Sequence, residues 1–347
     1  MQSELSNRLE TEVLGMSAVS AEEGGTLRAA VIGASGIGKH HAKWYHLAGC
    51  DVVAICGSSQ ATAEKTAQAL ADLFGFRGTP YCDIEAMLAK ARPDVVSVCT
   101  PVHLHREPAI AALRAGAHVM CEKPLVLDTA KDRAMLVAEG EEICSTAEAE
   151  DRLLAVNTQY VAGAEQYVEW VLEGERPAAI HSLLSQMESR GAHGPVQGEK
   201  IWIDLGSHPL SILMGLVPDG EMRGDTLRCE IEEKRVVAQF EYVSPTTGTC
   251  DVEIVVRNRP EGDLVRRFGI NGKLMDYEGR NDEQGVFCAY LTHEGRETKR
   301  SDFVQVSLER FIAAARGEGD GVLATGRDGL KNLDMQLAIL ERGKHSG

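Results

Sequence analysis

The first third of the chain alternates between continuous apolar runs and amphipathic stretches. Four apolar runs have the length of buried strands, at 27–32, 51–56, 94–99 and 118–121. The stretches between them, one ending near residue 48 and others at 61–73, 84–90 and 107–115, carry apolar residues at helical spacing. Strands that are apolar throughout and alternate with helices predict a parallel sheet covered on both faces, a doubly wound α/β fold.

The pattern changes after Pro124. A long helical stretch at 129–149 leads into an apolar strand at 153–157. Runs that alternate apolar and polar residues then follow at 180–188, 227–232, 236–242, 251–257 and 268–271. Helical spacing returns at 307–316 and 327–342. We expect a second, α+β domain with a large, mostly antiparallel open sheet, beginning near residue 126, with its C-terminal helix packed back on the first domain.

The chain has the composition of a globular protein with an acidic surface. Of 347 residues, 44% are hydrophobic and 25% are charged, and the formal net charge is −16. This length suits two domains. Nucleic acids and anionic membranes attract clustered lysine and arginine, so the charge argues against both as partners. One local cationic pocket would still admit an anionic substrate.

Cysteine usage and the N-terminal segment add two expectations. The nine cysteines form no CxxC pair, which favours reduced structural thiols in a cytoplasmic protein and predicts no metal site. No apolar segment is long enough to cross a membrane. Residues 1–26 carry early acids and no hydrophobic signal core, so we expect an extension outside the main fold.

The first predicted strand runs into a glycine-rich turn, Gly33-Ala34-Ser35-Gly36-Ile37-Gly38. A helix that starts after such a turn points its first amides at an anion, and the glycines let a pyrophosphate approach the backbone. Ser35 stands where the usual middle glycine would be. The turn nevertheless predicts a dinucleotide site formed by Gly33, Ser35, Gly36, Ile37 and Gly38, with 27–125 as a Rossmann domain.

The tip of the second strand bears on which dinucleotide binds. An acid at this place would bind the 2′-hydroxyl of NAD, but the tip is Cys56-Gly57-Ser58-Ser59. Ser58 and Ser59 leave room for a 2′-phosphate and offer it hydroxyl groups, and Lys39 is a candidate for added charge. These residues favour NADP over NAD, and NAD stays the alternative.

Three further segments complete a family resemblance. They are TPVHLH at 100–105, AGAHVMCEKP at 115–124 and IDLGSHPL at 203–210. Together with the glycine turn, in this order, they resemble the Gfo/Idh/MocA oxidoreductases, which include sugar, sugar-nucleotide and inositol dehydrogenases. The resemblance is strongest over 27–125. It implies a cofactor lying against Thr100, Pro101, His105, Glu122 and Lys123.

The resemblance also implies the reacting residues. Lys123 matches the family's active-site lysine, and Asp204 and His208 match its Asp-x-x-x-His pair. Hydride transfer at a carbinol carbon needs proton transfer at its oxygen, which suits a histidine, while a lysine stabilises an oxygen that becomes alkoxide-like. Asp204, four residues before His208, would orient the imidazole or bind a neighbouring hydroxyl. Tyr160, at the end of a predicted strand, is a further candidate for substrate contact.

The expected activity is NAD(P)-linked oxidation or reduction of a secondary alcohol on a sugar, sugar derivative or cyclitol, by a homodimer or homotetramer. Without the resemblance, Lys123 is equally a surface turn residue and His208 a helix-start residue paired with Asp204. Two alternatives stay open within the family. One is a cofactor-bound regulator without turnover, and the other is an NAD-dependent glycoside hydrolase that acts by transient oxidation.

Overall fold

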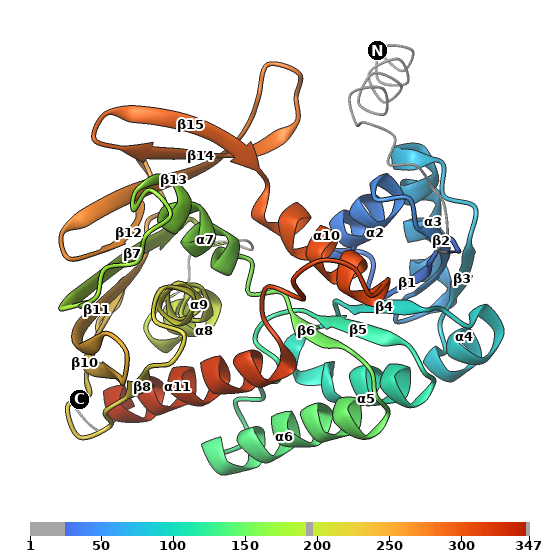
Figure 1. Cartoon of the computed structure of the whole chain (residues 1–347). Helices are drawn as coiled ribbons and strands as arrows, with labels where there is room; N and C mark the ends of the chain where they lie inside the picture. The colour runs from blue at the N-terminus through green and yellow to red at the C-terminus, as the bar shows by residue number, and fades with distance from the viewer. Residues whose placement is uncertain (1–24, 192–196, 345–347) are drawn as a thin grey trace. The chain divides into compact units, whose positions relative to one another are not determined.

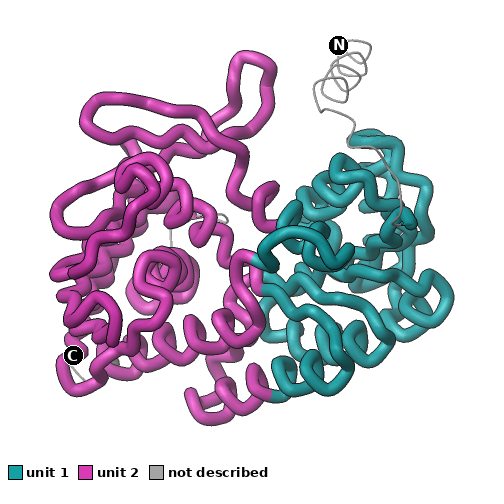
Figure 2. The backbone as a smooth tube through the Cα atoms, viewed as in Figure 1, with its two compact units in different colours: residues 1–122, 142–155, 308–322 teal, residues 123–141, 156–307, 323–347 magenta. Residues whose placement is uncertain are grey.

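A computed structural model describes residues 25–191 and 197–344 of the chain. The described residues form two compact units (Figure 2). The first unit includes residues up to 122 together with 142–155 and 308–322, and the second includes 123–141, 156–307 and the chain from 323 onward. The predicted extension at 1–26 lies, apart from its last two residues, outside the described part.

The first unit contains a six-stranded sheet in the order β3-β2-β1-β4-β5-β6 (Figure 1). Every recorded strand pair from β3 to β5 is parallel. The strands are β1 (Arg28–Ile32), β2 (Asp51–Cys56), β3 (Thr79–Tyr81), β4 (Val95–Val98), β5 (His118–Cys121) and β6 (Leu154–Val156). The predicted parallel Rossmann sheet is confirmed.

Helices cover both faces of this sheet, as the apolar strands require. α2 and α3 pack together on β1 and β2, whereas α4 and α5 pack together below β2 and β5 (Figure 1). Their bounds are α2 (Gly38–Leu47), α3 (Gln60–Phe74), α4 (Ile84–Ala91) and α5 (Arg106–Arg114), with the short η1 (Val102–Leu104) before α5 and α6 (Arg133–Ala149) after β5.

Local side chains determine where these helices begin and end. Asp83 caps α4 by accepting the amide of Ala86 at 2.7 Å, and Ser59 caps α3 in the same way at Thr62. Gly75 ends α3 in the left-handed conformation, with φ of 78°. The strand β3 escaped prediction because its three half-exposed residues are too few to show a hydrophobic period.

The second unit contains a nine-stranded sheet with β7 and β11 at its centre. Its strands are β7 (Ser182–Ser189), β8 (Glu221–Met222), β9 (Arg228–Ile231), β10 (Arg235–Ser244), β11 (Gly248–Asn258), β12 (Arg266–Ile270), β13 (Lys273–Asn281), β14 (Phe287–His293) and β15 (Arg296–Ser301). The pairing is antiparallel except between β7 and β11, which run parallel. The predicted mostly antiparallel open sheet is confirmed.

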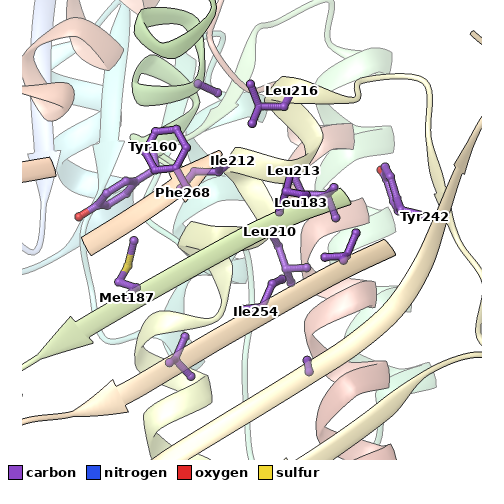
Figure 3. Packing of buried hydrophobic residues seen from close by; sticks show 14 of the residues in the cluster. Tyr160, Leu183, Met187, Leu210, Ile212, Leu213, Leu216, Tyr242, Ile254 and Phe268 are labelled. Carbon is purple, nitrogen blue, oxygen red and sulfur yellow. The ribbon is translucent and has the colours of Figure 1, made fainter. Parts of the chain in front are cut away.

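Helices pack on one face of this sheet and bury its core. α8 contacts β10 and β11, and α9 lies on β7 beside α7. The bounds are α7 (Tyr160–Trp170), α8 (Glu199–Leu205), α9 (Ser207–Leu216), α10 (Phe303–Ala315) and α11 (Gly326–Lys344). Figure 3 shows side chains of the core between these layers, with Tyr160 and Tyr242 at opposite ends of the drawn cluster.

One sequence expectation changes in the second unit. Tyr160 does not end a strand, because β6 stops at Val156 and Tyr160 begins α7. α11 packs on α8, α9 and β9 and is grouped with the second unit, whereas residues 308–322, with most of α10, are grouped with the first. That the C-terminal helix packs back on the first domain stays a prediction. An amphipathic period shows which face of a helix is buried but not which surface covers it.

Among the described helices, none combines the length and hydropathy that a membrane span requires.

Candidate active site

The glycine turn joins β1 to α2 at two places where only a glycine fits. Gly33 has φ of 86°, and a Cβ atom there would lie 2.5 Å from the carbonyl oxygen of Cys99. A Cβ atom on Gly38 would lie 2.6 Å from the carbonyl oxygen of Gly33. The chain therefore turns sharply, and α2 starts pressed against the end of β1.

The outer part of the same turn is open and rich in unused amides. Ser35, Gly36 and Ile37 are exposed, and a Cβ atom on Gly36 would meet nothing within 4 Å. Within the described ranges, the amides of these three residues donate no hydrogen bond to the protein. Exposed amides at the start of a helix suit an anion, so the turn fits a pyrophosphate despite the serine at its centre.

The hydroxyl groups of Ser58 and Ser59, at the tip of β2, lie in different surroundings. Ser59 uses its hydroxyl inside the protein, where it accepts the amide of Thr62 and bonds the Thr62 hydroxyl at 2.9 Å. Ser58 is exposed, with no hydrogen bond among the described contacts. Of the two predicted cofactor residues, Ser58 is the one whose hydroxyl faces solvent.

The loop after β4 is braced from inside by a histidine. His105 is 2% exposed, and its Nε2 bonds the carbonyl oxygen of Thr100 at 2.9 Å. The hydroxyl of Thr100 donates to the carbonyl of Leu104, and Pro101 is exposed at the start of η1. Pro101 is thus exposed, Thr100 is partly exposed and His105 is buried. The contacts of these three residues with the cofactor stay predictions.

Glu122 is held by a chain of buried polar groups that the sequence did not reveal. His41 is fully buried, with Nε2 at 2.9 Å from the Glu122 carboxylate and Nδ1 at 2.9 Å from the Ser97 hydroxyl. The Tyr45 hydroxyl lies 2.8 Å from that of Ser97. The tautomer of His41 that carries its proton on Nε2 satisfies every member, because Nε2–H donates to the carboxylate and Nδ1 accepts from Ser97. His41, three residues after the last glycine of the turn, thereby positions Glu122.

Lys123 is the next residue in the chain and the first of its segment in the second unit. Its Nζ donates to the backbone carbonyl of Asp204 at 2.8 Å. Glu122, in the first unit, and Lys123, in the second, are therefore joined by one peptide bond. The residues that fit the cofactor and those that fit proton transfer are linked at this point in the sequence.

Asp204 and His208 lie on either side of a break between two helices. α8 ends at Leu205 and α9 begins at Ser207. No ion pair joins the Asp204 carboxylate to His208 in the described structure, where Asp204 offers its carbonyl to Lys123. Both roles foreseen for Asp204, orientation of the imidazole and contact with a substrate hydroxyl, stay predictions.

α11 anchors this break through buried amides. Trp202 in α8 is fully buried and donates its indole N–H to the carbonyl of Gln336 at 3.0 Å, while Gln336 donates back to the carbonyl of Trp202 at 3.2 Å. Asn332 donates to the carbonyl of Ser207 at 2.9 Å. Asn332 and Gln336 lie four residues apart on a helix, and their polar character on a buried face was the available sequence signal.

His208 sits in a nearly closed environment. It is 9% exposed, and its ring lies 4.7 Å from that of Tyr160, centroid to centroid. Nδ1 is buried without a hydrogen-bond partner, so Nε2 is the nitrogen that a ligand reaches. Burial, then the charges of Lys123 and Arg266, hold the pKa of His208 well below its usual range. The imidazole is therefore neutral at pH 7 and ready to accept a proton.

Aromatic side chains and an arginine surround Tyr160. Its ring meets Tyr277 edge-on at 5.4 Å and Phe303 at 5.8 Å. The guanidinium of Arg266 lies 5.7 Å from the centre of the Tyr277 ring. Tyr160 is 5% exposed, so neighbouring groups cover most of its ring, and its contact with substrate stays a prediction. Tyr277, Phe303 and Arg266 were not foreseen, because each reaches the site from a different element.

The parallel sheet and the glycine turn after β1 are those of a dinucleotide-binding Rossmann protein. A family model described as an oxidoreductase family with an NAD-binding Rossmann fold, Gfo/Idh/MocA, matches residues 27–158. The chain is 37% identical over 294 residues to 1,5-anhydro-D-fructose reductase of Ensifer adhaerens, an alignment covering 76% of this chain and 81% of that protein. The chain belongs to the Gfo/Idh/MocA oxidoreductase family.

Two other proteins are similar to it. D-glucoside 3-dehydrogenase of Escherichia coli (strain K12) is 34% identical over 206 residues, which is 56% of this chain and only 55% of that protein's length. The structure of UDP-N-acetylglucosamine 3-dehydrogenase from Acidithiobacillus ferrooxidans superposes with a TM-score of 0.69 at 18% identity, covering 92% of this chain and 98% of that one. This second likeness is one of fold.

Two substitutions in the glycine turn are expected to separate folding from nucleotide binding. Gly33→Ala forces a side chain onto a positive φ and against Cys99, which we expect to destabilise the chain by about 2–4 kcal/mol. Gly36→Ala points into open space, so its melting temperature should match the wild type, while nucleotide affinity falls about tenfold or more because the pyrophosphate is kept from the amides. Thermal denaturation with and without nucleotide measures both, and unchanged affinity in Gly36→Ala would contradict the assignment.

Proposed function

We propose that the chain is an NAD(P)-dependent oxidoreductase that interconverts a secondary alcohol and a ketone on a sugar, sugar derivative or cyclitol. The observation that carries the proposal is the arrangement around His208. A neutral imidazole exposes Nε2 while its pKa is lowered by burial and by the charges of Lys123 and Arg266. Its Nδ1 is sealed from solvent and has no hydrogen-bond partner.

The cofactor has a fitting place in the first unit. The amides of Ser35, Gly36 and Ile37 suit its pyrophosphate. Thr100 follows β4 and Glu122 follows β5, so both lie at the carboxyl edge of the sheet. When bound, the dinucleotide supplies the hydride chemistry. The residues of the protein bind it, hold it in place and manage the proton that the reaction releases.

The proton is managed by the second unit. In the direction of oxidation, Nε2 of His208 takes the proton of the substrate hydroxyl. Lys123, held in place by the Asp204 carbonyl, stabilises the negative charge that grows on that oxygen. The Asp204 carboxylate binds a neighbouring hydroxyl and thereby orients the ring. In the direction of reduction, the same groups act in reverse.

We also propose a preference for NADP. A pocket beside the glycine turn is lined by Ser35, Lys39, Thr62 and Lys65. Neither lysine forms an ion pair within the described part of the chain, and no acid stands at the tip of β2. Two lysine charges and the Ser58 hydroxyl suit a phosphate on the adenosine ribose.

Lys65→Gln is the sharpest test of that preference. We expect it to weaken NADPH binding about tenfold, because a charge-assisted contact to the 2′-phosphate is lost, and to leave NADH binding unchanged. Lys90→Gln, on α4 away from the turn, is the matched control. Tighter binding of NADH than of NADPH by the wild type would overturn the preference.

The proposed activity is tested first by nucleotide binding. NAD, NADH, NADP and NADPH are added separately to nucleotide-free protein, and a bound nucleotide at about 100 times its Kd should add about 2.7 kcal/mol of stability. The nucleotide that binds is then used with sugars and cyclitols while cofactor reduction is followed. Binding without turnover would favour a regulator, and release of an aglycone without net reduction would indicate a glycoside hydrolase. No binding would overturn the proposal.

Other expectations from the sequence stay predictions. These are the homodimer or homotetramer, the cytoplasmic location, and the domain boundaries near residues 26 and 125. In the described ranges, no three histidine, cysteine, aspartate or glutamate side chains gather as metal ligands would. The absence of a metal stays a prediction as well.

A further inference from the structure

Arg266 is a charged residue whose part in the proposed reaction is so far limited to lowering the pKa of His208. It is the first residue of β12 and pairs with Met187 of β7, so it lies on the face of the sheet that carries the helices and the core. Its guanidinium is half-buried and lies 5.7 Å from the centre of the Tyr277 ring. Tyr277 contacts Tyr160, and Tyr160 contacts His208.

Arg266 has no acidic partner. In the described ranges, no carboxylate lies within ion-pair distance of its guanidinium, and its one hydrogen bond is a long contact of 3.4 Å from Nε to the Glu188 carbonyl. The terminal nitrogens of the guanidinium are therefore available. A half-buried arginine loses part of its hydration. An anionic group that accepts hydrogen bonds from the guanidinium compensates for this loss.

The neighbouring arginines show the contrast. Arg267, the next residue, makes a two-pronged ion pair with Asp276 at 2.6 and 3.0 Å. Arg257 and Arg259 both lie against the buried carboxylate of Glu188, at 3.5 and 3.3 Å. Arg266 alone among these four arginines points its charge toward the aromatic group beside His208.

The charges that act on His208 also indicate that Arg266 lies close to it. The cations that act on it are Lys123 and Arg266, and the neighbouring rings of Tyr160 and Tyr277 are buried with raised pKa values. Both tyrosines therefore stay neutral at pH 7. The charge of Asp302 acts on both tyrosines and raises their pKa values.

We propose that Arg266 binds a carboxylate or phosphate group of the substrate, so that the substrate is an acidic sugar or cyclitol derivative such as a uronic acid or a sugar phosphate. This inference rests on the proposed function and narrows its substrate class. The planar guanidinium matches a carboxylate or phosphate with two parallel hydrogen bonds, and the Tyr277 ring, 5.7 Å away, attracts its charge. An acidic protein thereby presents a local positive site.

The test uses three substrates that share one ring: D-glucose, D-glucuronate and D-glucose 6-phosphate. The full chain is assayed with the nucleotide that it binds best, as wild type, Arg266→Gln and Arg267→Gln. We expect kcat/KM for one of the two anionic substrates to exceed that for D-glucose about tenfold or more in the wild type, because charge-assisted hydrogen bonds are strong in a desolvated site. A preference for D-glucuronate indicates a carboxylate site, and a preference for D-glucose 6-phosphate indicates a phosphate site.

Arg266→Gln should remove this preference: kcat/KM for the preferred anionic substrate should fall about tenfold or more further than kcat/KM for D-glucose. The change in the pKa of His208 affects all three substrates alike, whereas only the anionic substrate loses a binding partner. Arg267→Gln, the matched control on the other face of β12, should keep it. A wild type that prefers D-glucose, or a preference that survives in Arg266→Gln, would overturn the inference.

If the protein turns over none of these sugars, calorimetric titration of D-glucuronate and D-glucose 6-phosphate into the nucleotide-loaded protein replaces the assay. Binding of either anion that is lost in Arg266→Gln supports the anion site even where the proposed reaction fails. Absence of binding, or equal binding by Arg266→Gln, overturns it.

Discussion

His208→Gln should lower kcat for alcohol oxidation by about 10²–10⁴-fold, the usual contribution of a general base. Glutamine keeps an amide nitrogen near the position of Nε2 and roughly the volume of the ring, so the aromatic packing under the site is maintained. It cannot take a proton at neutral pH. Nucleotide affinity, measured by thermal shift, should stay as in the wild type because the glycine turn is untouched.

The pH profile makes this expectation sharper. Burial, Lys123 and Arg266 lower the pKa of His208, so the base stays neutral at pH values where an ordinary histidine is protonated. The kcat/KM for oxidation should thus remain level as the pH falls to about 6.5, the usual histidine value, and decline only below it. Arg266→Gln removes one cation, which raises the pKa of His208 and moves that decline to higher pH.

A matched control is available in the same unit. His293 is 7% exposed, and its Nδ1 bonds the carbonyl of Leu274 at 2.8 Å on β13. His293→Gln should cost stability but leave kcat and its pH profile unchanged. Near-normal turnover in His208→Gln, or a wild-type decline that begins above pH 6.5, would contradict the assignment of His208 as the base.

Lys123→Met should lower kcat by about 10²–10³-fold, comparable to the loss of one donor that stabilises a developing oxyanion. Methionine keeps much of the apolar stem but removes the charge and the hydrogen bond to Asp204. Because a cation near His208 is also removed, the pKa of His208 should rise, and the acid limb of the residual activity should move to higher pH.

Lys131→Met provides the control for this substitution. Lys131 forms a surface ion pair with Glu139 at 2.7 Å, and water and salt screen such pairs strongly. Its replacement should alter neither kcat nor the pH profile. Weaker nucleotide binding by Lys123→Met, with kcat unchanged at saturating nucleotide, would instead assign Lys123 to the cofactor alone.

The sequence by itself determined the parts of this protein that depend on local pattern. Strands such as 51–56 and 118–121 were predicted to the residue, because a parallel sheet buries both faces and makes each strand apolar throughout. The turn from Gly33 to Gly38 was identified because its geometry needs glycines at given positions in the chain. The order of four motifs was enough to indicate the family.

Tertiary structure decided everything that depends on which distant residues meet. Arg266, Tyr277 and Phe303 come from three elements, and no spacing in the chain places them beside Tyr160. The lowered pKa of His208 arises from burial and from charges that lie far away in sequence. Likewise, Asp204 contributes a backbone carbonyl to Lys123, and a carbonyl is invisible in residue identity. Periodicity records how a segment meets water, whereas the electrostatics of a site depend on long-range packing that no local pattern encodes.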